Sequence, residues 1–75
     1  MLMADEYFDG DEVQALLQQA IASLPEVQRQ VFCLRYYDDM KYSEMSTLLG
    51  TSQGALKASY HLAVKKIQDF FNHND

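Results

Sequence analysis

Cysteine is nearly absent from this chain of 75 residues, in which Cys33 stands alone. A single cysteine cannot form an intramolecular disulfide, and there is no cluster of histidine and cysteine that could frame a zinc site. We therefore expect a protein of the reducing cytoplasm, with no metal and no cofactor. Cys33 itself is expected to be a small, partly buried apolar residue inside a helix.

Long apolar runs and catalytic groupings are missing as well. No stretch reaches the roughly 18 consecutive apolar residues of a membrane-spanning helix, and the N-terminus lacks the basic start and apolar run of a secretory signal. The sequence offers no nucleophile paired with a base, no phosphate-cradling loop and no paired carboxylates on a buried element. These absences predict a soluble protein that is not an enzyme, has no catalytic residue and does not bind membranes.

Basic residues are scarce, with 6 Lys and Arg against 11 Asp and Glu and a net charge of -5. DNA affinity depends on local cations that face phosphates, however, and the charge is unevenly distributed. Residues 1–26 hold six acids and no Lys or Arg, whereas residues 53–68 hold Lys57, Lys65 and Lys66 and no acid. An acidic half that faces away from a mildly basic helix is compatible with DNA binding, although a charge run can also be a solvated face.

The chain is long enough for one small domain, and its 48% apolar and 23% charged residues are typical of a globular protein. We expect residues 1–10 to form a flexible lead-in and residues 11–75 to form the domain. From Asp11 onward, apolar residues recur at spacings of three and four, which predicts an amphipathic helix with Asp9 or Asp11 as its N-cap. The apolar positions of this first helix are Val13, Leu16, Leu17, Ala20, Ile21 and Leu24.

Pro25 separates the first helix from a second one. The residue before a proline disfavours the helical region, whereas proline itself fits the first helical position. The second helix is predicted to run to about Tyr37 with one apolar face toward the core. The residues expected on that face are Val27, Val31, Leu34 and either Phe32 or Tyr36.

Two further helices are predicted to meet at a tight turn. Ser43 is the expected N-cap of a short helix that ends at Gly50, where a left-handed residue would fit. Ser52 is expected to cap a long helix over residues 53–71. Gly54 in its first turn costs helix stability, which indicates either a close approach of backbone to DNA or ordinary tolerance at a helix start. The apolar residues are Met45, Leu48 and Leu49 in the short helix and Leu56, Tyr60, Ala63, Val64, Ile67 and Phe70 or Phe71 in the long one.

A short helix, a tight turn at residues 50–52 and a long helix form the pattern of a helix-turn-helix. In this arrangement the second helix offers its N-terminal half to the major groove, and the first helix braces it across the DNA backbone. A helical hairpin with a glycine turn can imitate the spacing. The pattern therefore predicts a helix-turn-helix fold more firmly than it predicts DNA binding.

The run of residues 24–71 adds a more specific signal. Its anchors are, in order, Leu24-Pro25 with Arg29, Val31-Phe32 with Leu34-Arg35-Tyr36, Glu44-Met45, Leu49-Gly50 with Ser52, Gly54, Leu56-Lys57, and His61 with Ala63. Over residues 16–71 this pattern resembles region 4 of bacterial RNA polymerase sigma factors, especially the extracytoplasmic-function class. Response-regulator helix-turn-helix domains share some of these anchors but usually lack the Leu-Pro and Leu-Arg-Tyr stretch. The resemblance implies an all-α bundle of four helices with a C-terminal helix-turn-helix and no wing.

The resemblance also implies a function and a DNA-binding surface. The domain would be a sequence-specific transcription initiation factor whose last helix recognises the minus-35 element of a promoter as part of the RNA polymerase holoenzyme. The flap of the polymerase β subunit would hold the domain, and an anti-sigma factor could regulate it. The residues nearest the DNA would be Ser52, Gln53, Gly54, Ala55, Lys57, Ala58 and His61.

The helical spacing agrees with this surface, since residues 53, 57, 58 and 61 lie opposite the apolar stripe of the last helix. The Gln53 amide can pair with an adenine edge, and the Lys57 ammonium can pair with guanine or a phosphate. His61 is either a solvated helix residue or a phosphate contact.

Several positions depart from the family pattern. Ala55 stands where threonine is common, and Ser59 and Leu62 stand where arginine is common. Because fewer cations mean fewer phosphate contacts, we expect weak DNA binding by the isolated domain and a modest dependence on salt. A holoenzyme could supply the missing affinity.

Two alternatives to a promoter-binding sigma domain remain open. One is a response-regulator type of transcription regulator. The other is a protein-interaction module with little DNA affinity, which binds an anti-sigma factor or a second copy of itself, although we do not predict a homo-oligomer. The apolar residues of its interaction surface would be Phe70, Phe71, Tyr7 and Phe8.

Two further side chains have structural interpretations. Arg29 is expected to pair with Glu44 as a brace between helices, and His73, in the polar tail of residues 72–75, is expected to be uninvolved in function.

Overall fold

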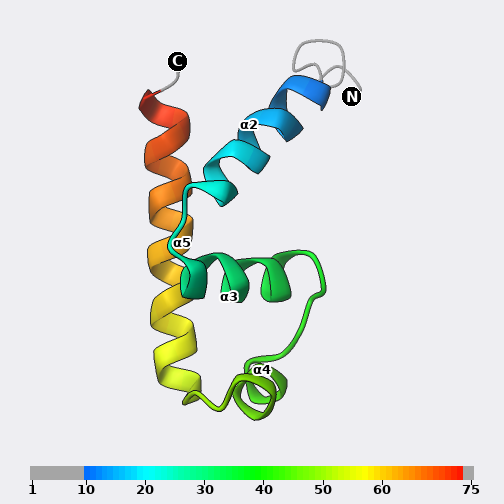
Figure 1. Ribbon diagram of the computed structural model, residues 1–75, viewed down its shortest axis with the longest axis vertical. Coiled ribbons are helices and arrows are strands. Elements are labelled where there is room, and N and C mark those ends of the chain that lie inside the picture. The colour runs from blue at the N-terminus through cyan, green and yellow to red at the C-terminus, as the bar shows by residue number, and fades with distance from the viewer. Residues whose placement is uncertain (1–9, 74–75) are drawn as a thin grey trace.

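The computed structural model describes residues 10–73, which form four α-helices and no β-strand. The helices are α2 (Gly10–Ala22), α3 (Glu26–Tyr36), α4 (Tyr42–Leu49) and α5 (Gln53–His73). In Figure 1, α5 stands as a column, α3 crosses it near its middle, α4 lies beside its first turns and α2 lies toward its later half. The predicted all-α bundle with a C-terminal helix-turn-helix is confirmed. Within the described part of the chain, no helix is long and apolar enough to cross a membrane.

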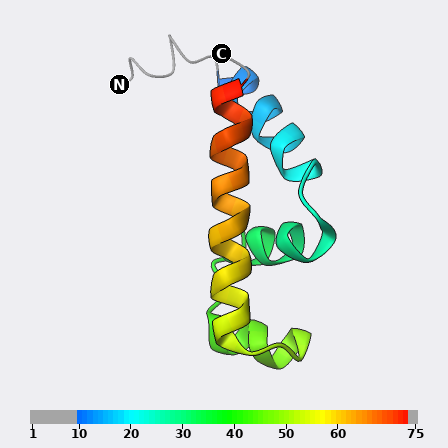
Figure 2. The same ribbon diagram turned by 90° about the vertical axis from the view of Figure 1, so that its left-hand side faces the viewer.

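The apolar core is divided into two clusters along α5. The large core joins α2, α3 and the later half of α5, and it consists of Ala20, Ile21, Leu24, Phe32, Ala63 and Ile67. The small core joins α3, α4 and the first turns of α5, and it consists of Val31, Met45 and Leu56. Tyr60 packs against both clusters. Figure 2 shows α2, α3 and α4 following one another along the length of α5. Both α3 and α5 contribute residues to the two cores.

The helix boundaries that depend on proline and glycine agree with the sequence-based expectation. Pro25 is the N-cap of α3, so the helix begins at Glu26, one residue later than predicted, and the Pro25 carbonyl accepts a hydrogen bond from the Arg29 N–H at 2.9 Å. Gly50 ends α4 in the left-handed region, with φ 67° and ψ 31°. Its N–H donates to the Ser46 carbonyl at 2.9 Å, which satisfies one of the free carbonyls at the helix end.

The predicted cap at Ser43 is wrong, and so is Asp11 as one of the two candidate caps of the first helix. Helix α2 already begins at Gly10, so Asp11 lies inside its first turn; Asp9 lies outside the described residues. Helix α4 begins at Tyr42 with Lys41 as its N-cap, so Ser43 is also helical. The Glu44 carboxylate accepts a hydrogen bond from the Lys41 N–H at 2.9 Å, and this contact replaces a hydroxyl cap.

Three apolar residues counted in the predicted helices are exposed, and one of them, Val27, was predicted to face the core. Val27 is 59% exposed, Leu48 is 62% exposed and Val13 is 40% exposed. The inward face of α3 runs through Gln28, Val31 and Phe32, and Val27 lies about 100° around the helix from Gln28. Between the two aromatic candidates on α3, Phe32 is the buried one and Tyr36 is exposed.

A row of aromatic rings connects α5 to the end of α3. The Phe32 ring stacks on Tyr60 with centroids 5.6 Å apart and on Tyr36 with centroids 5.1 Å apart. Tyr37 then meets Tyr36 edge to face at 5.0 Å, and the Gln18 amide of α2 donates to the Tyr37 hydroxyl at 3.0 Å. The stack of Phe32 on Tyr60 joins α3 to α5, and such aromatic pairs stabilise a fold beyond the area that they bury.

Candidate nucleic-acid interface

The start of α5 is fixed by its own cap. The Ser52 hydroxyl accepts a hydrogen bond from the Ala55 N–H at 3.2 Å, and the Ser52 carbonyl accepts one from the Leu56 N–H at 3.0 Å. The predicted cap is therefore confirmed. Leu56 is only 1% exposed and packs in the small core, so the first turns of α5 have one buried side and one side in solvent.

Every side chain that was expected to approach DNA lies on the solvent side of these turns. The exposed residues of this set are Ser52, Gln53, Gly54, Ala55, Lys57, Ala58 and His61. A methyl group built on Gly54 would meet no other group within 4 Å, so packing within the domain does not require glycine there. The surface is continuous over about 14 Å of helix, which is comparable to the width of the major groove at about 12 Å.

Lys57 contacts a ring from the neighbouring helix. Its Nζ lies 5.7 Å from the centroid of the Tyr42 ring, and the Arg35 Cζ lies 5.1 Å from the same centroid. Both distances are within the range of cation–π interactions. Three helices therefore place two cations and one ring beside the exposed turns of α5, and sequence reasoning did not predict this arrangement.

The connection between α3 and α4 brings Arg35 to this position. The Arg35 Nη1 donates to the Met40 carbonyl at 3.0 Å, and the Met40 N–H donates to the Leu34 carbonyl at 3.0 Å. Asp39 has a positive φ of 53°, which an aspartate tolerates better than most side chains, and its carboxylate is 4.0 Å from Arg35. These contacts hold the guanidinium close to the start of α4.

The departures from the family pattern occupy two different environments. Ser59 is half-buried, whereas Leu62 is 46% exposed. An arginine at position 62 would thus have reached solvent, and leucine there removes one cation from the exposed surface. Lys57 is the one Lys or Arg in residues 53–62.

The predicted brace between Arg29 and Glu44 is wrong. The Arg29 Nη1 donates to the Leu24 carbonyl at 3.3 Å, at the end of the linker before α3. Glu44 instead accepts the hydrogen bond from the Lys41 N–H. Each side chain thus satisfies a backbone group near its own helix start, which a pairing rule based on opposite charge does not consider.

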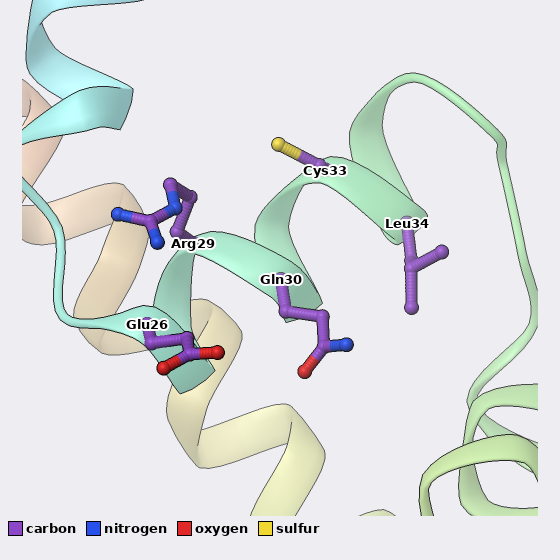
Figure 3. A pocket seen from close by; sticks show the side chains of 5 residues that line it. All are labelled: Glu26, Arg29, Gln30, Cys33 and Leu34. Atoms are coloured by element: carbon purple, nitrogen blue, oxygen red, sulfur yellow. The ribbon is translucent and has the colours of Figure 1, made fainter.

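An open depression of about 350 Å³ lies along α3 (Figure 3). Its lining residues are Glu26, Arg29, Gln30, Cys33 and Leu34. Arg29 and Cys33 point to one side of the helix and Gln30 and Leu34 to the other, so the side chains diverge and do not converge on a common point. Cys33 is half-buried and packs against the large core, as expected for a small apolar residue.

The aromatic residues near the C-terminus are part of the fold. Phe70 and Phe71 are half-buried against the large core and meet edge to face at 6.4 Å. Helix α5 continues to His73, whose ring nitrogen Nδ1 lies 2.7 Å from the Asp69 carbonyl. Tyr7 and Phe8, the other residues expected in a protein-interaction surface, lie outside the described residues.

The comparison with protein families decides between the types of helix-turn-helix. The model of the family "Sigma-70, region 4" matches residues 14–67, which extend from α2 into the second half of α5. The chain belongs to this family. The match thus includes α3, α4 and most of α5, and it supports a sigma factor domain over the response-regulator alternative.

A curated relative agrees with this membership. The region 4 domain is 34% identical over 56 residues to an RNA polymerase sigma-E factor of Streptomyces antibioticus, and the match covers 75% of the chain. The matched segment is 31% of the relative, so the chain spans less than a third of that protein's length. No solved structure matches the chain.

Proposed function

We propose that this region 4 domain recognises the minus-35 element of a promoter as part of RNA polymerase holoenzyme. One observation carries the proposal: all seven residues expected to approach DNA are exposed at the start of α5, and Lys57 is among them. A helix about 10–12 Å in diameter fits the major groove. Gln53 and Lys57 are four residues apart, so they lie on the same side of the helix and can reach neighbouring bases.

The chemistry of these side chains assigns different roles to them. The Gln53 amide is suited to the hydrogen-bonding edge of adenine, and the Lys57 ammonium to guanine or to a phosphate. Ser52 and Gln53 are exposed at the start of α5, near the positive end of the helix dipole, where a phosphate is favoured. Gly54 allows the DNA backbone to come close, since no side chain fills its surroundings.

The proposal includes the holoenzyme because the exposed surface at the start of α5 carries few cations. Each neutralised phosphate contributes about -0.9 to the slope of log affinity against log salt, and Lys57 stands without a second Lys or Arg in residues 53–62. The isolated domain should thus bind weakly and lose little affinity with salt. Attachment to the flap of the polymerase β subunit would raise the local concentration of promoter DNA, and an anti-sigma factor would compete for the domain.

Selection from a pool of short duplexes with a randomised centre tests the proposal. At low salt, near 50 mM, the wild-type chain should enrich one short motif that includes an adenine or guanine contact. The same selection with Gln53→Ala should lose preference at one base position, while total DNA retention changes little. A wild-type chain that enriches no motif, alone or with polymerase core enzyme, would contradict the proposed function.

A further inference from the structure

Tyr42 occupies the point where α3, α4 and α5 meet. It is the first residue of α4, is half-buried and packs against the small core. Its ring centroid lies 5.7 Å from the Lys57 Nζ on α5 and 5.1 Å from the Arg35 Cζ on α3. The ring therefore interacts with one cation from each of the neighbouring helices.

Both ends of the contact between Tyr42 and Lys57 are anchored in buried structure. Met45 is one turn after Tyr42 and is fully buried, and Leu56 immediately precedes Lys57 and is 1% exposed. Met45 and Leu56 belong to the same small core. The backbone positions that carry the ring and the ammonium are thus fixed by packing, and only the flexible lysine stem needs to be ordered.

A tyrosine ring and a carboxylate can each hold a lysine side chain in place, but they affect its charge differently. A carboxylate would neutralise the ammonium, and DNA would have to displace it, whereas the face of a ring attracts the cation and leaves its charge in place. Among the described residues, the carboxylate found within ion-pair distance of a Lys or Arg is that of Asp39, which is 4.0 Å from Arg35 and not near Lys57. Lys57 is therefore held in place but still carries its full charge toward solvent.

We propose that Tyr42 is a positioning residue for the DNA contact of Lys57. The ring holds the ammonium at the junction of α4 and α5 before DNA arrives, so less side-chain freedom is lost on binding. This inference rests on the proposed DNA-binding function, and it adds an affinity-determining residue outside the helix that reads DNA. Ordering matters particularly here because Lys57 is the single Lys or Arg in residues 53–62.

A double-mutant cycle with a short duplex selected by the wild-type chain tests the inference. Tyr42→Leu removes the ring but keeps an apolar side chain against the small core, and it should weaken DNA binding about fivefold. Tyr42→Phe keeps the ring and loses the hydroxyl, and it should bind within about twofold of the wild type. In a Lys57→Met background, the further change Tyr42→Leu should have no effect on affinity.

A second measurement requires no DNA. In the NMR spectrum of the free wild-type chain, the side-chain methylene protons of Lys57 should be shifted upfield by the Tyr42 ring. The same protons of Lys66, for which no ring contact is found in the described structure, serve as the reference. The shift should persist in Tyr42→Phe and disappear in Tyr42→Leu, whose helical content is checked by circular dichroism.

The outcomes separate the inference from the function on which it rests. Binding losses of Tyr42→Leu that are the same with and without Lys57 would overturn the positioning role while leaving DNA binding intact. An unshifted Lys57 would overturn it too, even if Tyr42→Leu failed to fold. A wild-type chain that binds no DNA at all would overturn the proposed function, and the positioning role with it.

Discussion

The Lys57→Glu variant is expected to bind its selected duplex at least about tenfold more weakly than the wild type at low salt, with unchanged helical content. The change removes a cation and adds an anion on an exposed side chain of the proposed DNA surface. Glutamate has about the same helix propensity as lysine and position 57 is exposed, so α5 should stay folded. Fluorescence anisotropy with a labelled duplex measures the affinity, and circular dichroism measures the helicity.

Lys66→Glu is the matched control, because it makes the same change in charge on the same helix. Position 66 is nine residues further along α5, about 180° around the helix and about 14 Å along its axis. This lysine is exposed but outside the proposed surface, and its replacement should cost less than about threefold in affinity because salt screens distant charges. Equal losses for the two variants would mean that only net charge matters, and not the face of α5.

The Leu56→Ala variant should lose about 2–5 kcal/mol of unfolding free energy. Leu56 is 1% exposed and is one of the three buried residues of the small core, so the cavity it leaves has few neighbours that can close it. A domain of this size has a total stability of about 4–11 kcal/mol, so the loss is a large part of the whole. Urea unfolding followed by circular dichroism measures the difference.

Leu62→Ala provides the comparison for stability. It makes the same chemical change on α5, but Leu62 is 46% exposed and belongs to neither core cluster. We expect it to change the unfolding free energy by less than about 1 kcal/mol. The described packing would be wrong if the two alanine variants were equally stable.

The parts of the fold that depend on local backbone chemistry were predictable. Pro25 marks the start of α3, Gly50 adopts the left-handed conformation at the end of α4, and the Ser52 hydroxyl caps α5. Each of these features follows from the steric or hydrogen-bonding properties of one residue and its immediate neighbours. They define the helix-turn-helix, which is why it could be recognised without a structure.

The wrong predictions concern features that depend on more than one element. Val27 fits the apolar spacing of α3, but α5 crosses that helix along the face of Val31 and Phe32. Ser43 has a suitable hydroxyl, yet Glu44 reaches back to the Lys41 N–H and α4 begins earlier. Periodicity and capping preference rank such candidates, and tertiary packing decides between them.

The residues of the candidate site could be predicted from the sequence, but the contacts that hold Lys57 in place could not. The seven candidate residues between Ser52 and His61 follow from the helix-turn-helix pattern and the family resemblance, and all seven are exposed. Arg35 and Tyr42 are far from Lys57 in sequence, and Arg35 and Lys57 contact the same Tyr42 ring only because the connection between α3 and α4 brings the three helices together. No spacing rule within one helix could have brought these three side chains together.

Amide chemical-shift mapping of the isotope-labelled chain, titrated with its selected duplex, tests the central claim that the start of α5 is the DNA-binding surface. We predict that the largest shifts occur in residues 52–61 and that the amides of Tyr42 and Arg35 shift as well. Largest shifts along the depression on α3, at Glu26, Gln30 and Leu34, with residues 52–61 unaffected, would contradict it.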